Sequence, residues 1–212
     1  MPIKNIIFDL GNVLLDVKPH MVRTFLAHTG DTDVDALHEH LFRTGAYIGL
    51  EVGTVSPAEF RNEVRKFSSN HLSDEAIDQA WNTMLGEIPS PRIDLLKKLK
   101  ERYRLFLLSN TNEIHYDAYS AYVKSTFDTR LEDFFEKAYY SHQMGLRKPD
   151  VQIYNKVLED SRLDPVETLF IDDYLENVRA ATKVGLMGFH LDDGKDICGY
   201  FDDDLNFNGK LT

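Results

Sequence analysis

The sequence predicts an α/β fold, a Rossmann-like parallel sheet core with an all-helical cap inserted after the first strand. Two observations predict the core: short apolar runs without the alternation of half-exposed strands, and amphipathic helical patterns between the later runs. A third predicts the cap, since the long stretch between the first and second apolar runs shows helical patterns only. Alternating strands and helices favour a parallel sheet with right-handed crossovers.

Five apolar runs are the expected strands of this sheet. Each carries Ile, Leu, Phe or Tyr at neighbouring positions, as expected for strands that are covered on both faces. In chain order they are residues 3–9, 103–109, 137–141, 167–172 and 186–190.

Three helices are expected between the later strands. The first, in SPRIDLLKKLKER, has Ser90 as the N-cap and Pro91 as its first helical residue. KPDVQIYNKVLED and YLENVRAATKVG show the same apolar spacing, and the last of these ends at Gly185. These helices would form the crossovers that cover the sheet.

The segment from about Pro19 to about Ile88 is too long for a simple crossover and contains no convincing strand. Helical periods occur in PHMVRTFLAHTG, DVDALHEHLFR, SPAEFRNEVRKF and SDEAIDQAWNTML. We therefore expect two domains, an α/β core made of residues 1–16 and 89–212 and a helical cap made of residues 17–88.

Charge and composition exclude several classes of partner. The 212 residues carry a net charge of −11, which disfavours nucleic acid or an anionic membrane as a partner. The single Cys198 cannot form an intramolecular disulfide, and the N-terminus lacks the apolar segment of a signal peptide. No run approaches the roughly 18 apolar residues of a membrane span. We expect a soluble, cytoplasmic protein that is a monomer or a weak homo-oligomer.

Polar side chains collect where the expected strands end. Asp9 ends the first, Ser109 and Asn110 end the second, and Asp172 and Asp173 end the fourth. In an open parallel sheet, these carboxyl ends converge on the crevice in which ligands bind. The sequence therefore predicts one site to which all three strands contribute.

These residue types are suited to phosphoryl chemistry. Asp9 and one of the paired aspartates are hard oxygen ligands for Mg²⁺, and the Gly11 carbonyl could complete the ligation. An oxygen of Asp9 could then attack phosphorus and form an aspartyl-phosphate that water hydrolyses. The phosphoryl oxygens would be held by hydroxyl, amide and ammonium donors of Ser109, Asn110, Thr111 and Lys148. The expected substrate is a small phosphorylated molecule.

Four segments in order, FDLGNV, LLSNTN, GLRKPD and LFIDDYLEN, resemble the four motifs of the haloacid dehalogenase-like hydrolase superfamily. The resemblance spans Asp9 to Gly185, and the insertion lies where that family has its C1 cap. It implies a Mg²⁺-dependent phosphatase. More narrowly, FDLGNV, SNTNEIH, GLRKPDVQIY and AYIGLEVGTVS are similar to bacterial α-D-glucose-1-phosphate phosphatases, which also have glycine at the position of Gly11.

The resemblance implies a role for each matched residue. Asp9 would be the nucleophile and a Mg²⁺ ligand, Gly11 a ligand through its carbonyl, and Asp173 a ligand through its side chain. Asp172 would reach the metal through water, and Asn177 stands where many relatives have an aspartate. The phosphate would be held by Ser109 and Lys148.

Simpler structural roles are open for some of these residues. Ser109 and Asn110 could cap the helix expected from about Glu113, since a cap and a phosphate site use the same exposed amides. His115, in SNTNEIH, is either a neighbour of the substrate or a residue of the helix surface.

Two residues of the cap segment AYIGLEVGTVSP, Tyr47 and Glu51, are candidates for contact with the substrate. The alternative is a turn built on Gly49 and Gly53, with Tyr47 packed beneath it.

Gly11 stands two residues after Asp9, in the loop that follows the first expected strand. It has no side chain that could transfer protons there. General acid–base assistance commonly contributes about 10²- to 10⁴-fold, so its loss should slow turnover without abolishing it. We hypothesise that the substrate compensates with a better leaving group, such as the anomeric oxygen of a sugar 1-phosphate. A base for the second step would then come from elsewhere, and Asp16 and Glu51 are the nearest candidates in sequence.

Three other functions stay open at this point. A haloacid dehalogenase would use Asp9 on carbon without a metal, although that resemblance leads one to expect tyrosine at position 11. A catalytically weakened phosphatase could act as a binding module, although Asp9, Lys148 and both later aspartates are retained. A phosphorelay receiver has similar acidic residues, but the helical insertion fits it poorly.

Overall fold

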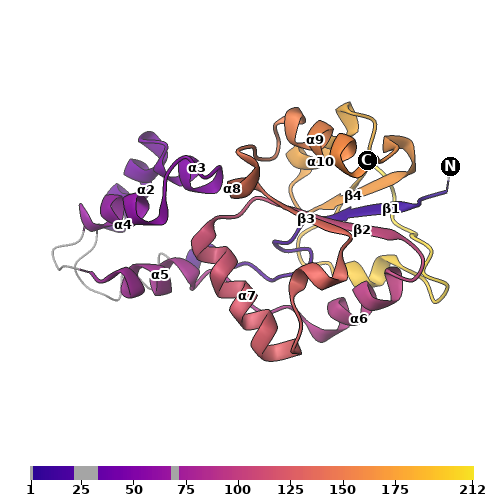
Figure 1. Cartoon of the computed structure of the whole chain (residues 1–212), viewed down its shortest axis with the longest axis horizontal. Coiled ribbons are helices and arrows are strands. Elements are labelled where there is room, and N and C mark those ends of the chain that lie inside the picture. Colours follow the sequence, from indigo (N-terminus) through magenta and orange to yellow (C-terminus); the bar gives the residue numbers. More distant parts are fainter. Residues whose placement is uncertain (1, 22–32, 68–71) are drawn as a thin grey trace.

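A five-stranded parallel sheet forms the centre of the α/β core (Figure 1). The computed structural model describes residues 2–21, 33–67 and 72–212. Within them the strand order is β3-β2-β1-β4-β5. The strands are β1 (Asn5–Phe8), β2 (Arg104–Ser109), β3 (Lys137–Tyr140), β4 (Thr168–Asp172) and β5 (Met187–His190). Each lies within one of the five predicted runs, so the predicted α/β fold is confirmed.

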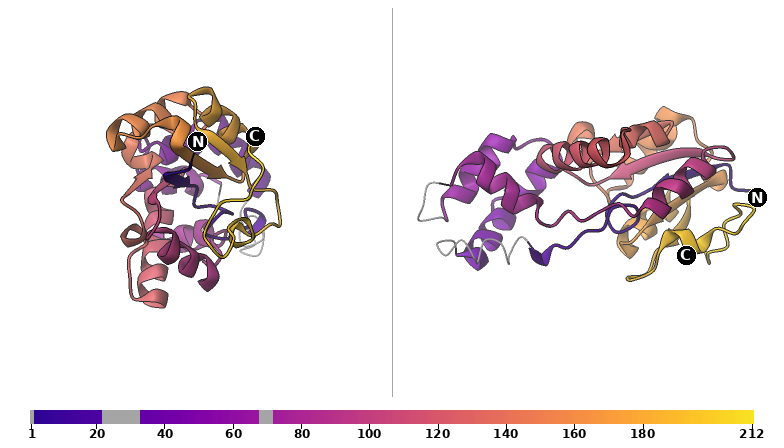
Figure 2. Two further views of the ribbon diagram at one scale, coloured as in Figure 1. Left: turned by 90° about the vertical axis from the view of Figure 1, so that its right-hand side faces the viewer. Right: turned by 90° about the horizontal axis from the view of Figure 1, so that it is seen from below.

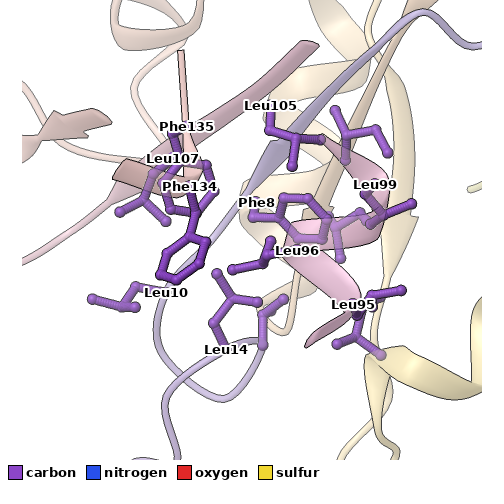
Figure 3. Close-up of a cluster of buried hydrophobic side chains, with 14 of the residues drawn as sticks. Phe8, Leu10, Leu14, Leu95, Leu96, Leu99, Leu105, Leu107, Phe134 and Phe135 are labelled. Carbon is purple, nitrogen blue, oxygen red and sulfur yellow. The ribbon is translucent and has the colours of Figure 1, made fainter. Parts of the chain in front are cut away.

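Both faces of this sheet are buried. Successive residues of a strand point to opposite sides, so neighbouring residues of β1 pack against different helices. On one side, Ile6 and Phe8 pack with α6 (Ser90–Leu99) and α7 (Glu113–Phe127), and Figure 3 shows Phe8 in the cluster with Leu96 of α6. On the other side, Ile7 packs with α9 (Val151–Ser161) and α10 (Leu175–Lys183). Full burial of a side chain such as Phe8 stabilises the fold by about 1.5–3 kcal/mol. The unbroken apolar runs are therefore explained by the two covered faces.

Two helix starts differ from the expected ones. The N-cap of α6 is Pro89, so Ser90 is the first helical residue, and no side chain caps this end. Proline is tolerated in the first turn because its missing N–H would have no partner there. The N-cap of α7 is Asn112, whose side chain accepts a hydrogen bond from the His115 N–H at 3.1 Å. Ser109 and Asn110 therefore do not cap α7.

Four short elements complete the core. They are α8 (Ser141–Met144) and the 3₁₀ turns η1 (Leu131–Phe134), η2 (Pro165–Glu167) and η3 (Ile197–Tyr200). In the described ranges, no helix is both long and apolar enough to cross a lipid bilayer.

Among the described residues, four helices lie between β1 and α6 in the chain and form a separate cluster at one end of the molecule (Figures 1 and 2). They are α2 (Val34–Arg43), α3 (Ala46–Glu51), α4 (Pro57–Arg65) and α5 (Asp74–Asn82). Leu41, Leu50, Phe60 and Ile77 are buried in their shared core. The helix expected in PHMVRTFLAHTG falls largely on residues 22–32, outside the described residues. The exact division into core and cap domains stays a prediction.

Helix α3 corrects the expectation of a turn on Gly49. Gly49 lies inside the helix, and its N–H donates to the Gly45 carbonyl at 2.7 Å. A Cβ at this position would lie 2.4 Å from Val55 Cγ2, so glycine lets the following chain fold back against the helix. The turn comes at Gly53, whose φ of 73° lies in the left-handed region that favours glycine.

Two linker segments, residues 16–18 and 84–87, run side by side between these helices and the sheet. Val17 and Leu85 form an antiparallel bridge. The Asp16 N–H donates to the Glu87 carbonyl at 3.0 Å, and the Gly86 N–H donates to the Asp16 carbonyl at 2.8 Å. This pairing lies next to the domain boundaries expected at residues 16 and 89.

Candidate active site

Lys148 lies between two aspartates at the carboxyl end of the sheet. Its Nζ is 2.7 Å from Asp9 Oδ1 and 2.6 Å from Asp172 Oδ2, and its side chain is 1% exposed. Asp9 follows β1 and Asp172 ends the neighbouring β4. Strand order reverses between β1 and β4, because β2 and β3 lie on the other side of β1. The structure therefore brings these three predicted residues together at the switch point where open α/β sheets bind ligands.

Negative charge exceeds positive charge in this cluster. Carboxylate oxygens of Asp9, Asp172 and Asp173 lie within 4.8 Å of one another, while Lys148 supplies one positive charge. Burial raises the pKa of Asp9 to about 7, against the opposing effect of Lys148, and Asp172 and Asp173 add to the rise. Burial alone would lower the pKa of Lys148, but the Asp172 and Asp9 carboxylates more than offset it and raise that pKa. Crowded, hard oxygen donors of this kind fit a Mg²⁺ ion.

The two paired aspartates have different surroundings. Asp172 is fully buried, and its oxygens accept hydrogen bonds from the Tyr174 N–H at 2.8 Å, from Asn177 Nδ2 at 3.0 and 3.1 Å, and from Lys148. Asp173 is partly exposed, and burial raises its pKa against the opposing hydrogen bond from Asn12. This contrast supports the role of direct ligand for Asp173 and an indirect role for Asp172.

Asn12 is a site residue whose role the sequence did not reveal. Its φ of 52° is left-handed, a conformation that Asn tolerates better than most residues. Its Nδ2 donates to Asp173 Oδ2 at 2.9 Å, and its Oδ1 accepts from the Val17 N–H at 2.9 Å. Asn12 thus joins the loop after β1 to the end of β4. The signal for the tight turn was the Gly11-Asn12 pair itself.

The loop after β2 holds Lys148 through a side chain. Asn110 Nδ2 donates to the Lys148 carbonyl and Asn110 Oδ1 accepts from the Lys148 N–H, each at 2.9 Å. The Thr111 N–H donates to Ser141 Oγ at 2.9 Å, so in this structure that amide is already paired and is not open to a phosphate. The phosphate-binding roles of Ser109 and of the Asn110 amide stay predictions.

A cavity of about 510 Å³ opens over this cluster. Ten of the predicted site residues line it: Asp9, Gly11, Tyr47, Glu51, Ser109, Asn110, Thr111, His115, Lys148 and Asp173. Asp172 lies beneath the cavity surface, where it is fully buried. Arg147 and Asn12 also line the cavity, although the sequence did not single them out.

Glu51, a residue of the helical cluster, lines the cavity. Its Oε2 lies 2.9 Å from Nε of Arg147, the residue before Lys148. Burial raises the pKa of Glu51, and Arg147 and Tyr47 oppose this rise. Burial also raises the pKa of Tyr47, and Glu51 adds to it. The signal for Arg147 was its place in GLRKPD, directly before the lysine.

His115 is buried between the sheet domain and the helical cluster. Its Nδ1 lies 2.7 Å from Asn82 Oδ1, and its ring is stacked on Trp81 at 5.7 Å between centroids. Burial lowers the pKa of His115 to about 3, so its imidazole is neutral at physiological pH. Of the two alternatives for His115, the helix-surface residue is therefore wrong, whereas contact with the substrate stays a prediction.

Folding stability should fall in acid because of His115. The unfolded chain takes up a proton near pH 6.5, whereas folded His115 resists protonation until about pH 3. The contribution of His115 to the free energy of unfolding is complete above pH 6.5. It falls with decreasing pH and is about 2 kcal/mol smaller at pH 5. Urea unfolding of wild type and His115→Gln at pH 7 and pH 5 measures this. Wild type should lose more stability than the variant, and equal losses would contradict the assignment.

Asp16 is not placed to act as the base. Its Oδ1 lies 2.8 Å from Arg92 Nη1, and its side chain is not among the cavity-lining groups found in the described residues. We expect Asp16→Asn to leave steady-state turnover unchanged and to weaken only the contact with Arg92. A tenfold fall in kcat, which corresponds to a rise of about 1.4 kcal/mol in activation free energy, would restore Asp16 as a candidate.

Comparisons with known proteins agree with this geometry. Residues 3–185 match the haloacid dehalogenase-like hydrolase family. D-ribitol-5-phosphate phosphatase from Bacteroides thetaiotaomicron is 32% identical over 92% of this chain and 94% of its own. Glyceraldehyde 3-phosphate phosphatase from Pyrococcus furiosus is 25% identical over 87% of this chain and 78% of its own.

A solved structure is similar over nearly the whole length. This HAD family enzyme from Bacteroides thetaiotaomicron, in complex with magnesium and inorganic phosphate, has a TM-score of 0.88 and 36% identity, covering 94% of this chain and 100% of that chain. The narrower similarity to α-D-glucose-1-phosphate phosphatases stays a prediction.

Proposed function

This chain belongs to the haloacid dehalogenase-like hydrolase family, and we propose that it removes phosphate from small phosphorylated metabolites through an aspartyl-phosphate on Asp9. It is a phosphatase of that family, and its cofactor is Mg²⁺. The observation that carries the proposal is the place of Asp9, which lines the cavity beside Lys148 and Asp173 in a group of carboxylates that fits a divalent cation.

In the proposed reaction, Asp9 attacks phosphorus with one carboxylate oxygen. The bond from phosphorus to the leaving oxygen breaks, and the leaving group departs as an alcohol after taking up a proton. Water then attacks the phosphorus of the aspartyl-phosphate, which releases inorganic phosphate and restores Asp9. Asp9, Gly11 and Asp173 would hold Mg²⁺, which neutralises phosphate charge when bound. Lys148, fixed by Asp172 and Asn110, and Ser109 would hold the phosphoryl oxygens.

Sugar and polyol phosphates are the substrates we propose first. The D-ribitol-5-phosphate phosphatase is similar over nearly its full length, which supports a phosphorylated polyol or sugar. α-D-Glucose 1-phosphate is the narrower proposal, and it rests on Gly11. Since this residue offers no proton donor, a leaving group that needs little protonation would react faster.

The test is a screen of phosphorylated metabolites with and without Mg²⁺, with Asp9→Asn as the inactive control. We expect Mg²⁺-dependent phosphate release from at least one sugar or polyol phosphate, and loss of that activity in EDTA. Halide release from a 2-haloacid in EDTA would instead support the dehalogenase alternative. Absence of phosphate release across a broad panel would support the binding-module alternative.

Gly11→Asp should increase turnover of substrates with poor leaving groups. A Cβ at this position would lie 3.4 Å from Val17 Cγ2, which is an ordinary van der Waals distance, so the first atom of the new side chain can be accommodated. A carboxyl group there could protonate the leaving oxygen, an effect worth up to about 10²- to 10⁴-fold. The measurement is kcat on ribitol 5-phosphate and on α-D-glucose 1-phosphate. A gain on the first that exceeds the gain on the second is expected, and a loss on both would contradict it.

A further inference from the structure

We propose that Arg147, held by Glu51, binds the hydroxyl groups of the leaving group and makes the enzyme prefer uncharged, hydroxyl-rich leaving groups over those with a second anionic group. This inference rests on the proposed phosphatase function. In this inference Arg147 and Glu51 select between uncharged and anionic leaving groups. The reaction at Asp9 does not by itself make this selection.

The two residues come from different parts of the fold. Glu51 is the last residue of α3, and Arg147 lies in the segment between α8 and α9. Both line the cavity that contains Asp9, and the distance from Arg147 Nε to Glu51 Oε2 is 2.9 Å. The backbone of the next residue, Lys148, is fixed by two hydrogen bonds with the Asn110 side chain, which donates one and accepts the other. Arg147 is therefore placed at a defined distance from the lysine that would hold the phosphate.

The pair buries Arg147 Nε and Glu51 Oε2 against each other and leaves the rest of the Arg147 side chain partly exposed. Neither Arg147 Nε nor Glu51 Oε2 makes an aligned hydrogen bond with another described residue, although both atoms are buried. The Arg147 side chain as a whole is 33% exposed, and that of Glu51 is 9% exposed. A guanidinium has five N–H donors, whereas a carboxylate only accepts. Arg147 Nε and Glu51 Oε2 face each other, so a hydroxyl group of the substrate would accept from the remaining N–H donors of the partly exposed Arg147, while Glu51 holds the guanidinium in place.

Charge in the cavity disfavours a second anion. Glu51 already offsets the positive charge of Arg147, and Asp9, Asp173 and Glu176 also line the cavity, with Lys148 opposing them. A second anionic group on the substrate would compete with Glu51 for Arg147 and leave a buried carboxylate unpaired. Since the Glu51 side chain is only 9% exposed, leaving its carboxylate without a cation is unfavourable. Neutral hydroxyl groups do not carry this penalty.

The turn after α3 fixes how closely the two sides approach. A Cβ on Gly53 would lie 2.3 Å from the carbonyl oxygen of His142 in α8. Glycine at this position therefore lets the end of α3 pack directly on the backbone of α8, a few residues before Arg147. This contact lies close in the chain to both Glu51 and Arg147.

The first test compares Arg147→Met with wild type on ribitol 5-phosphate and p-nitrophenyl phosphate. A hydrogen bond to a charged group is typically worth enough that its loss lowers kcat/KM by about 10- to 100-fold, and we expect this loss on ribitol 5-phosphate, mainly through KM. Activity on p-nitrophenyl phosphate, which has no hydroxyl groups for Arg147 to bind, should be kept. Equal losses on both substrates would overturn the proposal.

The second test uses Glu51→Gln, which leaves the charge of Arg147 uncompensated. The ratio of kcat/KM for 3-phosphoglycerate, which carries a carboxylate, to that for ribitol 5-phosphate should rise by about tenfold or more. An unchanged ratio would overturn the proposal.

Two controls make these results interpretable. Arg104→Met removes an exposed guanidinium that pairs with Glu136 away from the cavity. It should change neither the preference for ribitol 5-phosphate over p-nitrophenyl phosphate nor that over 3-phosphoglycerate. If Arg147→Met unfolds, Arg147→Lys takes its place, because it keeps the positive charge without the planar guanidinium. It should still lower kcat/KM on ribitol 5-phosphate more than on p-nitrophenyl phosphate. Failure of the proposed function is distinct, because it would appear as full activity of Asp9→Asn or as no phosphatase activity in wild type.

Discussion

Asp9→Asn should lower kcat by about 10⁴-fold or more, the scale of loss seen when a catalytic nucleophile is removed. Asn keeps the shape of the side chain but cannot attack phosphorus. Steady-state phosphate release with Mg²⁺ present measures the effect, and Asp16→Asn is the matched control because its side chain pairs with Arg92 instead. Activity within tenfold of wild type would remove Asp9 as the nucleophile.

The same variant should keep its stability in metal-free buffer. Burial raises the pKa of Asp9 from 3.8 to about 7, so the ionised carboxylate is unfavourable in the metal-free fold. A raised carboxyl pKa means that the folded state loses stability relative to a neutral residue as pH rises from about 4 toward 7. Asn has no such charge, and Lys148 retains Asp172 as a partner. We expect the Tm of Asp9→Asn at pH 8 to equal or exceed that of wild type. This result would show that the variant loses activity because it lacks the nucleophile and not because it unfolds.

Lys148→Met should be the most destabilising of the variants considered, and it should also abolish activity. Lys148 is buried between Asp9 and Asp172, so its removal leaves two carboxylates without their cation. Loss of one partner of a buried pair costs about 3–5 kcal/mol. Urea unfolding in Mg²⁺-free buffer measures the loss.

Two further variants test the cause of that loss. Lys97 forms an exposed pair with Asp94, so Lys97→Met should change stability by less than about 1 kcal/mol. Adding Asp172→Asn to Lys148→Met removes one unpaired charge, and it should restore part of the stability without restoring activity. If the double variant is less stable than Lys148→Met, burial of unpaired charge is not the cause.

The sheet and the position of its site could be predicted because local features determine them. Each strand carries apolar residues for both buried faces, as Ile6, Ile7 and Phe8 show in β1. Once the strands are parallel, polar residues at their carboxyl ends must lie near one another. Asp9, Lys148 and Asp172 are therefore brought together as expected.

Features that depend on long-range packing could not be predicted. Helix α3 includes Gly49, which weakens a helix by itself, and only the packing of Val55 against it explains the residue. Asp16 is near Asp9 in sequence, but Arg92, distant in sequence, binds its side chain. Likewise, only the fold shows that Asn12 bonds Asp173 and that Glu51 meets Arg147.

The central claim is that Asp9 carries the phosphoryl group during turnover. The most direct measurement is acid quenching of the Mg²⁺-loaded enzyme within one turnover of a substrate found in the screen, followed by mass spectrometry of its peptides. We predict a phosphoryl group on the peptide that contains Asp9, absent from Asp9→Asn. Rapid phosphate release by wild type with no phosphorylated Asp9 peptide at any quench time, or with phosphate on another residue, would contradict the account.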